Sequence, residues 1–142
     1  MRFMMIVKAN PESEAGAMPE DAMLDAMGRY NEELTKAGVL LDLAGLQPSS
    51  KGVRVQFKGD KRSVIDGPFT ESKELIAGYW LIQVKSKEEA VAWALRVPNP
   101  HGEGAETNIE LRPLFELDDL APSEAVERMR ERLHKFDASR QK

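Results

Sequence analysis

Residues 76–84 read IAGYWLIQV, and this stretch decides the fold. Aromatic and β-branched side chains dominate it, which is typical of a β-strand. Alternation along a strand places Tyr79 and Leu81 on one face of the sheet, and it places Trp80 and Ile82 on the other. Because both faces are apolar, we expect a central strand or one that is covered on both sides.

A helix and a last strand are predicted after this central strand. Ser86 and Glu89 stand at capping-box spacing, which predicts a helix that begins next to Ser86. Pro98 ends the helical pattern, and a glycine-containing loop over residues 101–105 follows. Apolar residues then alternate with polar ones over residues 107–112, which predicts a strand.

The segment before the central strand predicts a strand, a helix and a second strand. Residues 1–8 are a short apolar run that ends in a lysine, as in a first strand. After a polar loop over residues 10–19, apolar side chains recur at helical spacing, and Gly38 fits the end of that helix. Residues 39–43 then predict a buried strand.

A β-hairpin is predicted between these two halves. Val53, Val55 and Phe57 alternate with polar residues, so we expect one buried and one wet face. A turn at residues 58–61 leads to a return strand. The sequence DGPF at residues 66–69 interrupts that strand, because glycine and proline together cannot continue a β-ladder.

This order of elements predicts the fold class. A β-α-β unit, a hairpin insertion and a second β-α-β unit are typical of an α+β ferredoxin-like sandwich, with both helices on one face of the sheet. The other face would be apolar and uncovered. We expect it to carry Phe3, Met5, Trp80, Ile82, Ile109 and Leu111 or their strand neighbours. A second copy would bury these side chains, which predicts a homodimer through the open sheet face.

Residues 118–142 are expected to form a C-terminal helical extension to a first domain of residues 1–117. Pro122 and Ser123 mark the start of a helix. Its apolar side chains form a narrow seam made of Val126, Met129, Leu133 and Phe136. A helix with such an apolar seam is expected to pack against another surface, which buries the seam. We expect it to dock along its own dimer, and the alternative is a groove on another protein.

Composition excludes several classes of function. The 142 residues are 42% hydrophobic and 31% charged, which indicates one globular core. With no cysteine and two histidines, a thiol nucleophile, a disulfide scaffold and a multi-histidine metal centre are excluded. The net charge of −4 argues against nucleic acid as a partner. No stretch approaches the about 20 apolar residues of a membrane span, so we expect a cytoplasmic protein without a membrane segment.

The sequence also lacks the signatures of several enzyme classes. It contains no P-loop, no dinucleotide-binding fingerprint, no Gly-x-Ser-x-Gly elbow and no His-Glu-x-x-His motif. We therefore expect neither a cofactor nor a metal ion. A heme or metal enzyme on the same fold would be a weaker variant, because His101 would be its sole strong ligand.

The stretch from Val64 to Glu74, which contains DGPF, together with residues 76–82 resembles the YCII-related family and specifically its DGPF-domain branch. Three further segments match in order: residues 1–5, 37–48 and 109–114. The resemblance covers about residues 1 to 117. It implies a ferredoxin-like fold that assembles as a dimeric α/β barrel.

For function, the resemblance implies less. The better-known branch of the family carries a histidine and an aspartate thought to form an acid-base site. This sequence has no histidine in its first helix, where Met27 or a neighbour occupies the equivalent turn, and Asp66 is the counterpart of the aspartate. DGPF proteins also look like frequent genomic neighbours or fusion partners of extracytoplasmic-function sigma factors, which implies a regulatory or accessory role.

Asp66 and His101 are the candidate catalytic residues. Asp66 lies at a strand end beside Gly67 and Pro68, and near aromatic rings it would act as a general base. The alternative is that Asp66 only hydrogen-bonds its own turn. His101 lies in a loop and would serve as a general base, or as a metal ligand together with Glu103 or Glu106. The alternative is a solvated loop histidine.

The candidate ligand-binding residues lie in or near the DGPF turn at residues 66–69. Gly67 and Pro68 would let backbone approach a ligand. Lys73 or Arg54 would hold an anionic group, and Phe69 and Tyr79 would line an apolar wall. The alternative assigns the charged residues to a solvated loop and the aromatic residues to the core.

Two hypotheses follow. The first is a homodimer with a pocket between the sheet and its covering elements, which binds a small organic molecule and uses Asp66 in proton transfer. The second is a non-catalytic module that engages a sigma factor or another protein. Both the reaction and the ligand stay open at this level.

Overall fold

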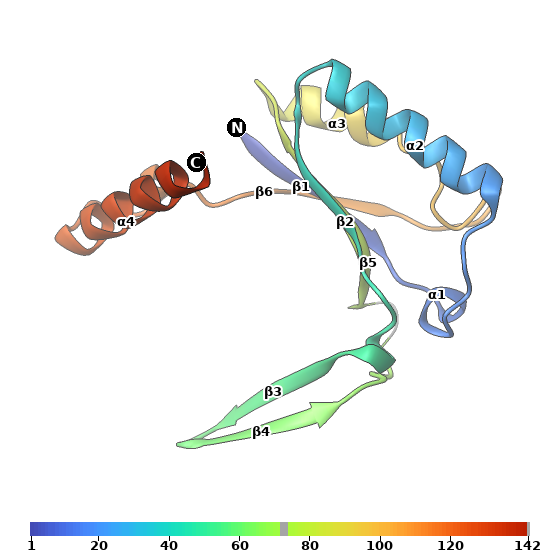
Figure 1. Ribbon diagram of the computed structural model, residues 1–142, viewed down its shortest axis with the longest axis horizontal. Helices are drawn as coiled ribbons and strands as arrows, with labels where there is room; N and C mark the ends of the chain where they lie inside the picture. The colour runs from blue at the N-terminus through green and yellow to red at the C-terminus, as the bar shows by residue number, and fades with distance from the viewer. Residues whose placement is uncertain (72–73, 142) are drawn as a thin grey trace.

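The computed structural model describes residues 1–71 and 74–141, and it has one main sheet, one separate hairpin and two longer helices that cover the same face of the sheet (Figure 1). The sheet contains β1 (Arg2–Lys8), β2 (Leu40–Gly45), β5 (Ile76–Gln83) and β6 (Ile109–Pro113), and the hairpin contains β3 (Val53–Lys58) and β4 (Lys61–Asp66). The α-helices are α1 (Pro11–Glu14), α2 (Asp21–Lys36), α3 (Lys87–Leu95) and α4 (Glu124–Arg140). Short 3₁₀ turns lie at Ser49–Lys51 and Leu117–Asp119.

The sheet has the strand order β2-β5-β1-β6, and every neighbouring pair is antiparallel. This order, with α2 after β1 and α3 after β5, is consistent with the ferredoxin-like fold expected from the sequence. Strand β5 lies between β2 and β1, so the prediction of a central strand is confirmed. The mixed α and β class and the C-terminal helix are confirmed as well.

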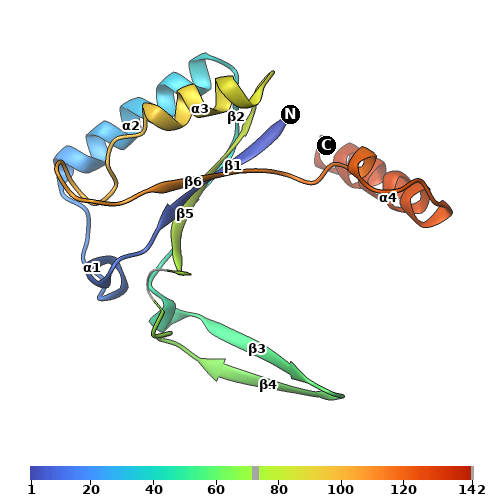
Figure 2. The same ribbon diagram turned by 180° about the vertical axis from the view of Figure 1, so that it is seen from behind.

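Helices α2 and α3 cover one face of the sheet, and the core lies between these helices and the sheet (Figure 2). Phe3 and Met5 of β1 and Trp80 and Ile82 of β5 point into this core, where Leu34 of α2 is fully buried. We expected these four side chains, or their strand neighbours, on the open face. They face the helices instead, so the expectation is wrong for this first set. The register pairs their neighbours, Met4 with Leu81 and Ile6 with Tyr79, so alternation assigns these side chains to the open face. There Met4, Tyr79 and Leu81 are half-buried, and Ile6 is only 8% exposed.

Local signals correctly predict the start of α3 and the end of α2. The Ser86 hydroxyl accepts a hydrogen bond from the Glu89 amide at 3.1 Å and so caps α3. Gly38 follows Ala37, the C-cap of α2, and has a φ of +72°, a conformation that glycine adopts without strain. The aromatic side chains Tyr30 and Trp80 meet edge to face in the core, with ring centroids 5.4 Å apart.

Three sequence-based expectations are wrong. Strand β2 is largely exposed, because it is an edge strand of the sheet. Neither face of the β3–β4 hairpin is buried, because the hairpin projects away from the sheet (Figure 1). The predicted polar loop after β1 contains a short helix, α1, with Asn10 as its N-cap.

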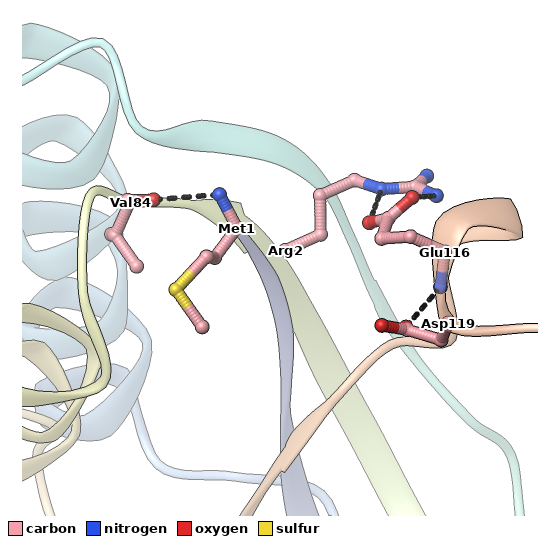
Figure 3. Close-up of polar contacts among 5 residues, drawn as sticks. All are labelled: Met1, Arg2, Val84, Glu116 and Asp119. Carbon is pink, nitrogen blue, oxygen red and sulfur yellow. Dashed lines mark hydrogen bonds and ion pairs between the residues drawn. The ribbon is translucent and has the colours of Figure 1, made fainter.

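Helix α4 begins after Ser123, whose hydroxyl accepts from the Val126 amide at 3.1 Å, as the sequence predicts. The segment before α4 is held to the sheet by Arg2, which makes two hydrogen bonds of 2.8 Å to the Glu116 carboxylate (Figure 3). Asp119 in turn caps the Glu116 amide at 2.8 Å. No helix among residues 1–71 and 74–141 is long and apolar enough to cross a membrane.

Candidate functional site

A cleft of about 400 Å³ lies where β1 ends, between the start of α2 and the loop that precedes β6. Val7, Met18 and Met23 give it apolar walls, while Glu12 and His101 bring polar groups. Its other lining residues are Asn10, Ser13, Ala17, Pro19, Glu20, Ala77, Pro100 and Gly102. A second opening of about 690 Å³ adjoins it and shares Asn10, Glu12 and His101, so His101 stands between the two.

The His101 ring is held by a hydrogen bond at each nitrogen. Nδ1 lies 2.8 Å from the side-chain nitrogen of Asn10, and Nε2 lies 2.9 Å from the carbonyl oxygen of Lys8. The Asn10 oxygen accepts from the Ser13 amide at 2.8 Å, so the amide nitrogen is the group that donates to Nδ1. Since the Lys8 carbonyl can only accept, the proton resides on Nε2. His101 therefore fastens its loop to the end of β1.

Asn10 connects this histidine to helix α1. Its side chain accepts from the Ser13 amide, and the Ser13 hydroxyl accepts from the Asn10 amide at 2.9 Å, which completes a capping box. Pro11 occupies the first turn, where a missing N–H is tolerated. The capping box thus fixes the orientation of the Asn10 side chain that the His101 ring requires.

The other end of α1 is linked to the DGPF turn through Ser49. Both the amide and the hydroxyl of Ser49 donate to the Glu14 carboxylate, the amide at 3.0 Å. The Ser49 hydroxyl also accepts from the Phe69 amide at 3.0 Å. A hydrogen-bonded path therefore runs from Phe69 through Ser49 and Glu14 to α1, and through Asn10 to His101.

The match with known proteins rests on the same chain segments. The model of the YCII-related domain matches residues 1–114, which spans the sheet, both covering helices and the hairpin. The chain belongs to the YCII-related family. An uncharacterized protein of Rhizobium meliloti (strain 1021) is 27% identical over 95 residues, which cover 67% of this chain and 75% of that relative. Helix α4 lies beyond the matched YCII-related domain.

Within the YCII-related domain, the two candidate catalytic residues belong to different surroundings. His101 lines the cleft, whereas Asp66 is exposed at the end of β4 and is not among the lining residues. In the part of the chain that the structure describes, no hydrogen bond or ion pair joins the Asp66 side chain to another group. Among the residues that the structure describes, no hydrogen bond or ion pair joins Asp66 to His101.

Four of the predicted ligand-binding residues, Arg54, Gly67, Pro68 and Phe69, lie together at the DGPF turn, and Tyr79 lies apart from them. The Arg54 guanidinium stacks over the Phe69 ring at 3.8 Å from its centroid, next to Gly67 and Pro68. Tyr79 lies on the open sheet face, away from the cleft, and its hydroxyl donates to Asp42 at 3.3 Å. The negative charge of Asp42 raises the pKa of the Tyr79 hydroxyl. Lys73 lies outside the described residues.

The metal hypothesis for His101 finds no support in the geometry. Among residues 1–71 and 74–141, no group of three or more histidine, aspartate or glutamate side chains is placed to hold an ion. Glu103 and Glu106 do not complete a ligand set with His101 there.

Sequence reasoning missed Asn10, Glu14 and Ser49, which position the cleft and the DGPF turn. The order Asn10, Pro11, Ser13 was a usable signal, because asparagine followed by proline and a hydroxyl residue is typical of a helix start. The contacts of Glu14 with Ser49 and of Asn10 with His101 join residues far apart in the sequence, and no local pattern predicts them.

Proposed function

We propose that this protein is a homodimer that binds a small organic molecule in the cleft at the end of β1. The observation that carries the proposal is the lining of that cleft, which combines apolar walls with a few polar groups, as small-molecule sites do. His101 and Asn10 hold one wall of the cleft against β1 through fixed hydrogen bonds. This pre-organisation lowers the entropic cost of binding.

The side chains around the cleft indicate the chemistry of its ligand. Val7, Met18 and Met23 suit an apolar body, and methionine adapts to irregular shapes. Glu12 and Glu20 are the charged residues of the lining, and as carboxylates they accept hydrogen bonds and attract cations. We therefore propose a small apolar molecule that carries an amine.

The hydrogen bonds of His101 favour binding over proton transfer. Nε2 already carries the proton that it donates to the Lys8 carbonyl, so only Nδ1 could take a proton from a ligand, and it would first have to break its bond to Asn10. His101 is thus proposed as a positioning residue. A role for Asp66 as a general base is a separate prediction. Asp66 is exposed, so this role requires another part of the protein assembly to form a concave site around its carboxylate.

The open face of the sheet supports the homodimer. Met4 and Ile6 of β1 and Tyr79 and Leu81 of β5 form its apolar centre. Asp42, Arg112, Glu110 and Lys8 surround this centre in the register of the sheet. An apolar centre with a charged rim is the usual anatomy of a protein interface. Packing of two such faces would form the dimeric α/β barrel, and the DGPF turn supports membership of the DGPF branch.

A matched pair of variants tests the ligand site. Met23→Trp places a large ring in the cleft, whereas Leu24→Trp adds the same ring to an exposed neighbour on α2. Thermal unfolding is measured with hexylamine, hexanol and hexanoate. We expect hexylamine to raise Tm most in the wild type and in Leu24→Trp, and to have no effect on Met23→Trp. A panel without any shift would contradict the proposal and favour the accessory module that acts with a protein partner.

A further inference from the structure

The β3–β4 hairpin has one apolar face that is exposed to solvent. Paired residues of a hairpin share a face, and the register pairs Val53 with Asp66, Val55 with Val64 and Phe57 with Arg62. We call Val53, Val55, Phe57 and Val64 the apolar hairpin face. These side chains are 55%, 49%, 64% and 67% exposed, respectively. A two-stranded ribbon is only marginally stable in water by itself, so we expect another surface to pack against this face.

Helix α4 has a second uncovered strip of similar size. Val126, Met129, Leu133 and Phe136 follow a 3-4-3 spacing and define the α4 seam. Met129, Leu133 and Phe136 are 47%, 46% and 55% exposed. The seam spans about 15 Å. The apolar hairpin face runs along strands of six residues, or about 20 Å, so the two strips match in length.

The two strips project from the same side of the sheet but from opposite ends of its strands. The hairpin precedes β5 at the end where Ile76 pairs with Lys8, and α4 follows β6 at the end where Pro113 pairs with Phe3. Both views show the hairpin and α4 on the side opposite α2 and α3 (Figure 1, Figure 2). They therefore flank the open sheet face at its two ends.

We propose that, in the homodimer, the apolar hairpin face of each copy packs against the α4 seam of the other copy. This inference rests on the dimer of the proposed function and assigns its axis. A two-fold axis that lies between the two sheets and crosses the strands brings the hairpin end of one copy to the α4 end of the other. The contact then forms twice, as symmetry requires.

Charge supports this pairing over a pairing of two hairpins. Residues 53–66 carry four basic and two acidic side chains, so the hairpin is positive. Residues 116–131, which form the approach to α4 and its first half, carry six acidic and two basic side chains. Opposite charges favour contact of the hairpin with this first half of α4. Residues 132–142 carry four basic side chains and one acidic one, so the favourable charge pairing is confined to the first half of the helix. Two hairpins would repel each other.

Because the chain has no cysteine, introduced thiols give an unambiguous test. The probe pair is Val55→Cys with Leu133→Cys in the full-length chain. The control pair is Gln56→Cys with Leu133→Cys, since the register places Gln56 on the opposite face of the hairpin. A second probe pair, Val64→Cys with Met129→Cys, guards against misfolding of the first. Each protein is oxidised after its reduced form shows wild-type thermal unfolding, and the products are separated without reductant.

We expect both probe pairs to form a covalent dimer at several-fold higher yield than the control pair, and mixed single variants Val55→Cys and Leu133→Cys to cross-link to each other. A covalent dimer of Leu133→Cys alone, of Val55→Cys alone, or an internal disulfide in a single chain would overturn the proposal. Sedimentation of the wild type distinguishes a failure of the hairpin–α4 contact from a failure of the homodimer. A dimer without cross-links contradicts only this contact, while a single chain contradicts the proposed homodimer as well.

Discussion

Gly67 passes so close to Ser49 that a Cβ added at Gly67 would lie 1.8 Å from the Ser49 carbonyl oxygen. The Gly67 amide also donates to the carbonyl oxygen of Gly52 at 3.0 Å. The glycine of the DGPF turn is therefore required by close approach of two backbones. This contact, together with the bond from the Phe69 amide to Ser49, holds the base of the hairpin against the 3₁₀ turn at Ser49–Lys51.

Gly67→Ala should consequently destabilise the protein, by about 1 to 3 kcal/mol, because backbone atoms have to move to admit the methyl group. Gly52→Ala is the matched control, since its Cβ would meet the Ser49 carbonyl oxygen at an ordinary 3.6 Å. Urea unfolding measures both variants. Equal stability of the two would show that the turn is not packed against Ser49 in solution.

The bond between Asn10 and His101 should behave as one coupled unit. We expect Asn10→Ala and His101→Ala each to cost about 1 to 2 kcal/mol, because each leaves the partner side chain without its bond. The double variant should cost clearly less than the sum, as a double-mutant cycle by urea unfolding would show. Strictly additive costs would mean that the two side chains do not interact.

Tyr30 predicts a loss of stability at alkaline pH. Burial raises the pKa of its hydroxyl from 10.0 to about 12, and this hydroxyl donates to the Trp93 carbonyl at 2.7 Å. In the folded state the hydroxyl keeps its proton, while the unfolded state loses it above pH 10, so its contribution is full below pH 10 and falls as pH rises toward 12.

The variant Tyr30→Phe isolates this effect. The wild type should exceed Tyr30→Phe in unfolding free energy by about 1 kcal/mol at pH 8, the value of a typical hydrogen bond. This advantage should shrink as the pH rises from 10 to 12. A constant difference over that range would contradict the assigned protonation state.

Arg2 and Glu116 predict an opposite response in acid. The hydrogen bonds from Arg2 lower the pKa of the Glu116 carboxyl below its ordinary value of 4.5. The contribution of the pair is therefore present above pH 4.5 and is lost as pH falls through the lowered pKa. Because both side chains are partly exposed, we expect Glu116→Gln to cost no more than about 1 kcal/mol at pH 7. The cost should shrink in urea unfolding as pH falls below 4.5 and the carboxyl takes up its proton, and a cost independent of pH would contradict the pair.

The open sheet face gives a prediction for assembly. Leu81→Glu puts a charge in the apolar centre of the face, and burial of an unpaired charge should weaken the proposed homodimer by about tenfold or more. Leu24→Glu changes an exposed residue on α2 and should leave assembly unchanged. Analytical ultracentrifugation compares them. Identical association of both variants would place the interface elsewhere.

Local sequence patterns predicted the elements of this fold well where they depend on neighbours in the chain. The alternation around Trp80 identified β5, and Ser86 and Gly38 marked helix ends, because periodicity and caps are properties of a few consecutive residues. The order of elements predicted the ferredoxin-like class, and the observed strand order β2-β5-β1-β6 is consistent with it.

The failures concern contacts that a short pattern does not contain. Val55 alternates with polar residues as a buried strand does, yet it is exposed because the hairpin leaves the sheet. The candidate site combined Asp66 and His101 from their chemical types, whereas their surroundings depend on Ser49 and Asn10, which are distant in sequence. Pairing across such distances is decided by packing of the whole chain.

Methyl NMR of the seven methionines tests the central claim most directly, because only Met18 and Met23 line the cleft. Met4 reports on the open sheet face and Met129 on the α4 seam. Titration with hexylamine should move the Met18 and Met23 signals and leave Met4 and Met129 in place. Saturable shifts at Met4 or Met129 instead, or no saturable shift at Met18 and Met23, would contradict the cleft as the ligand site.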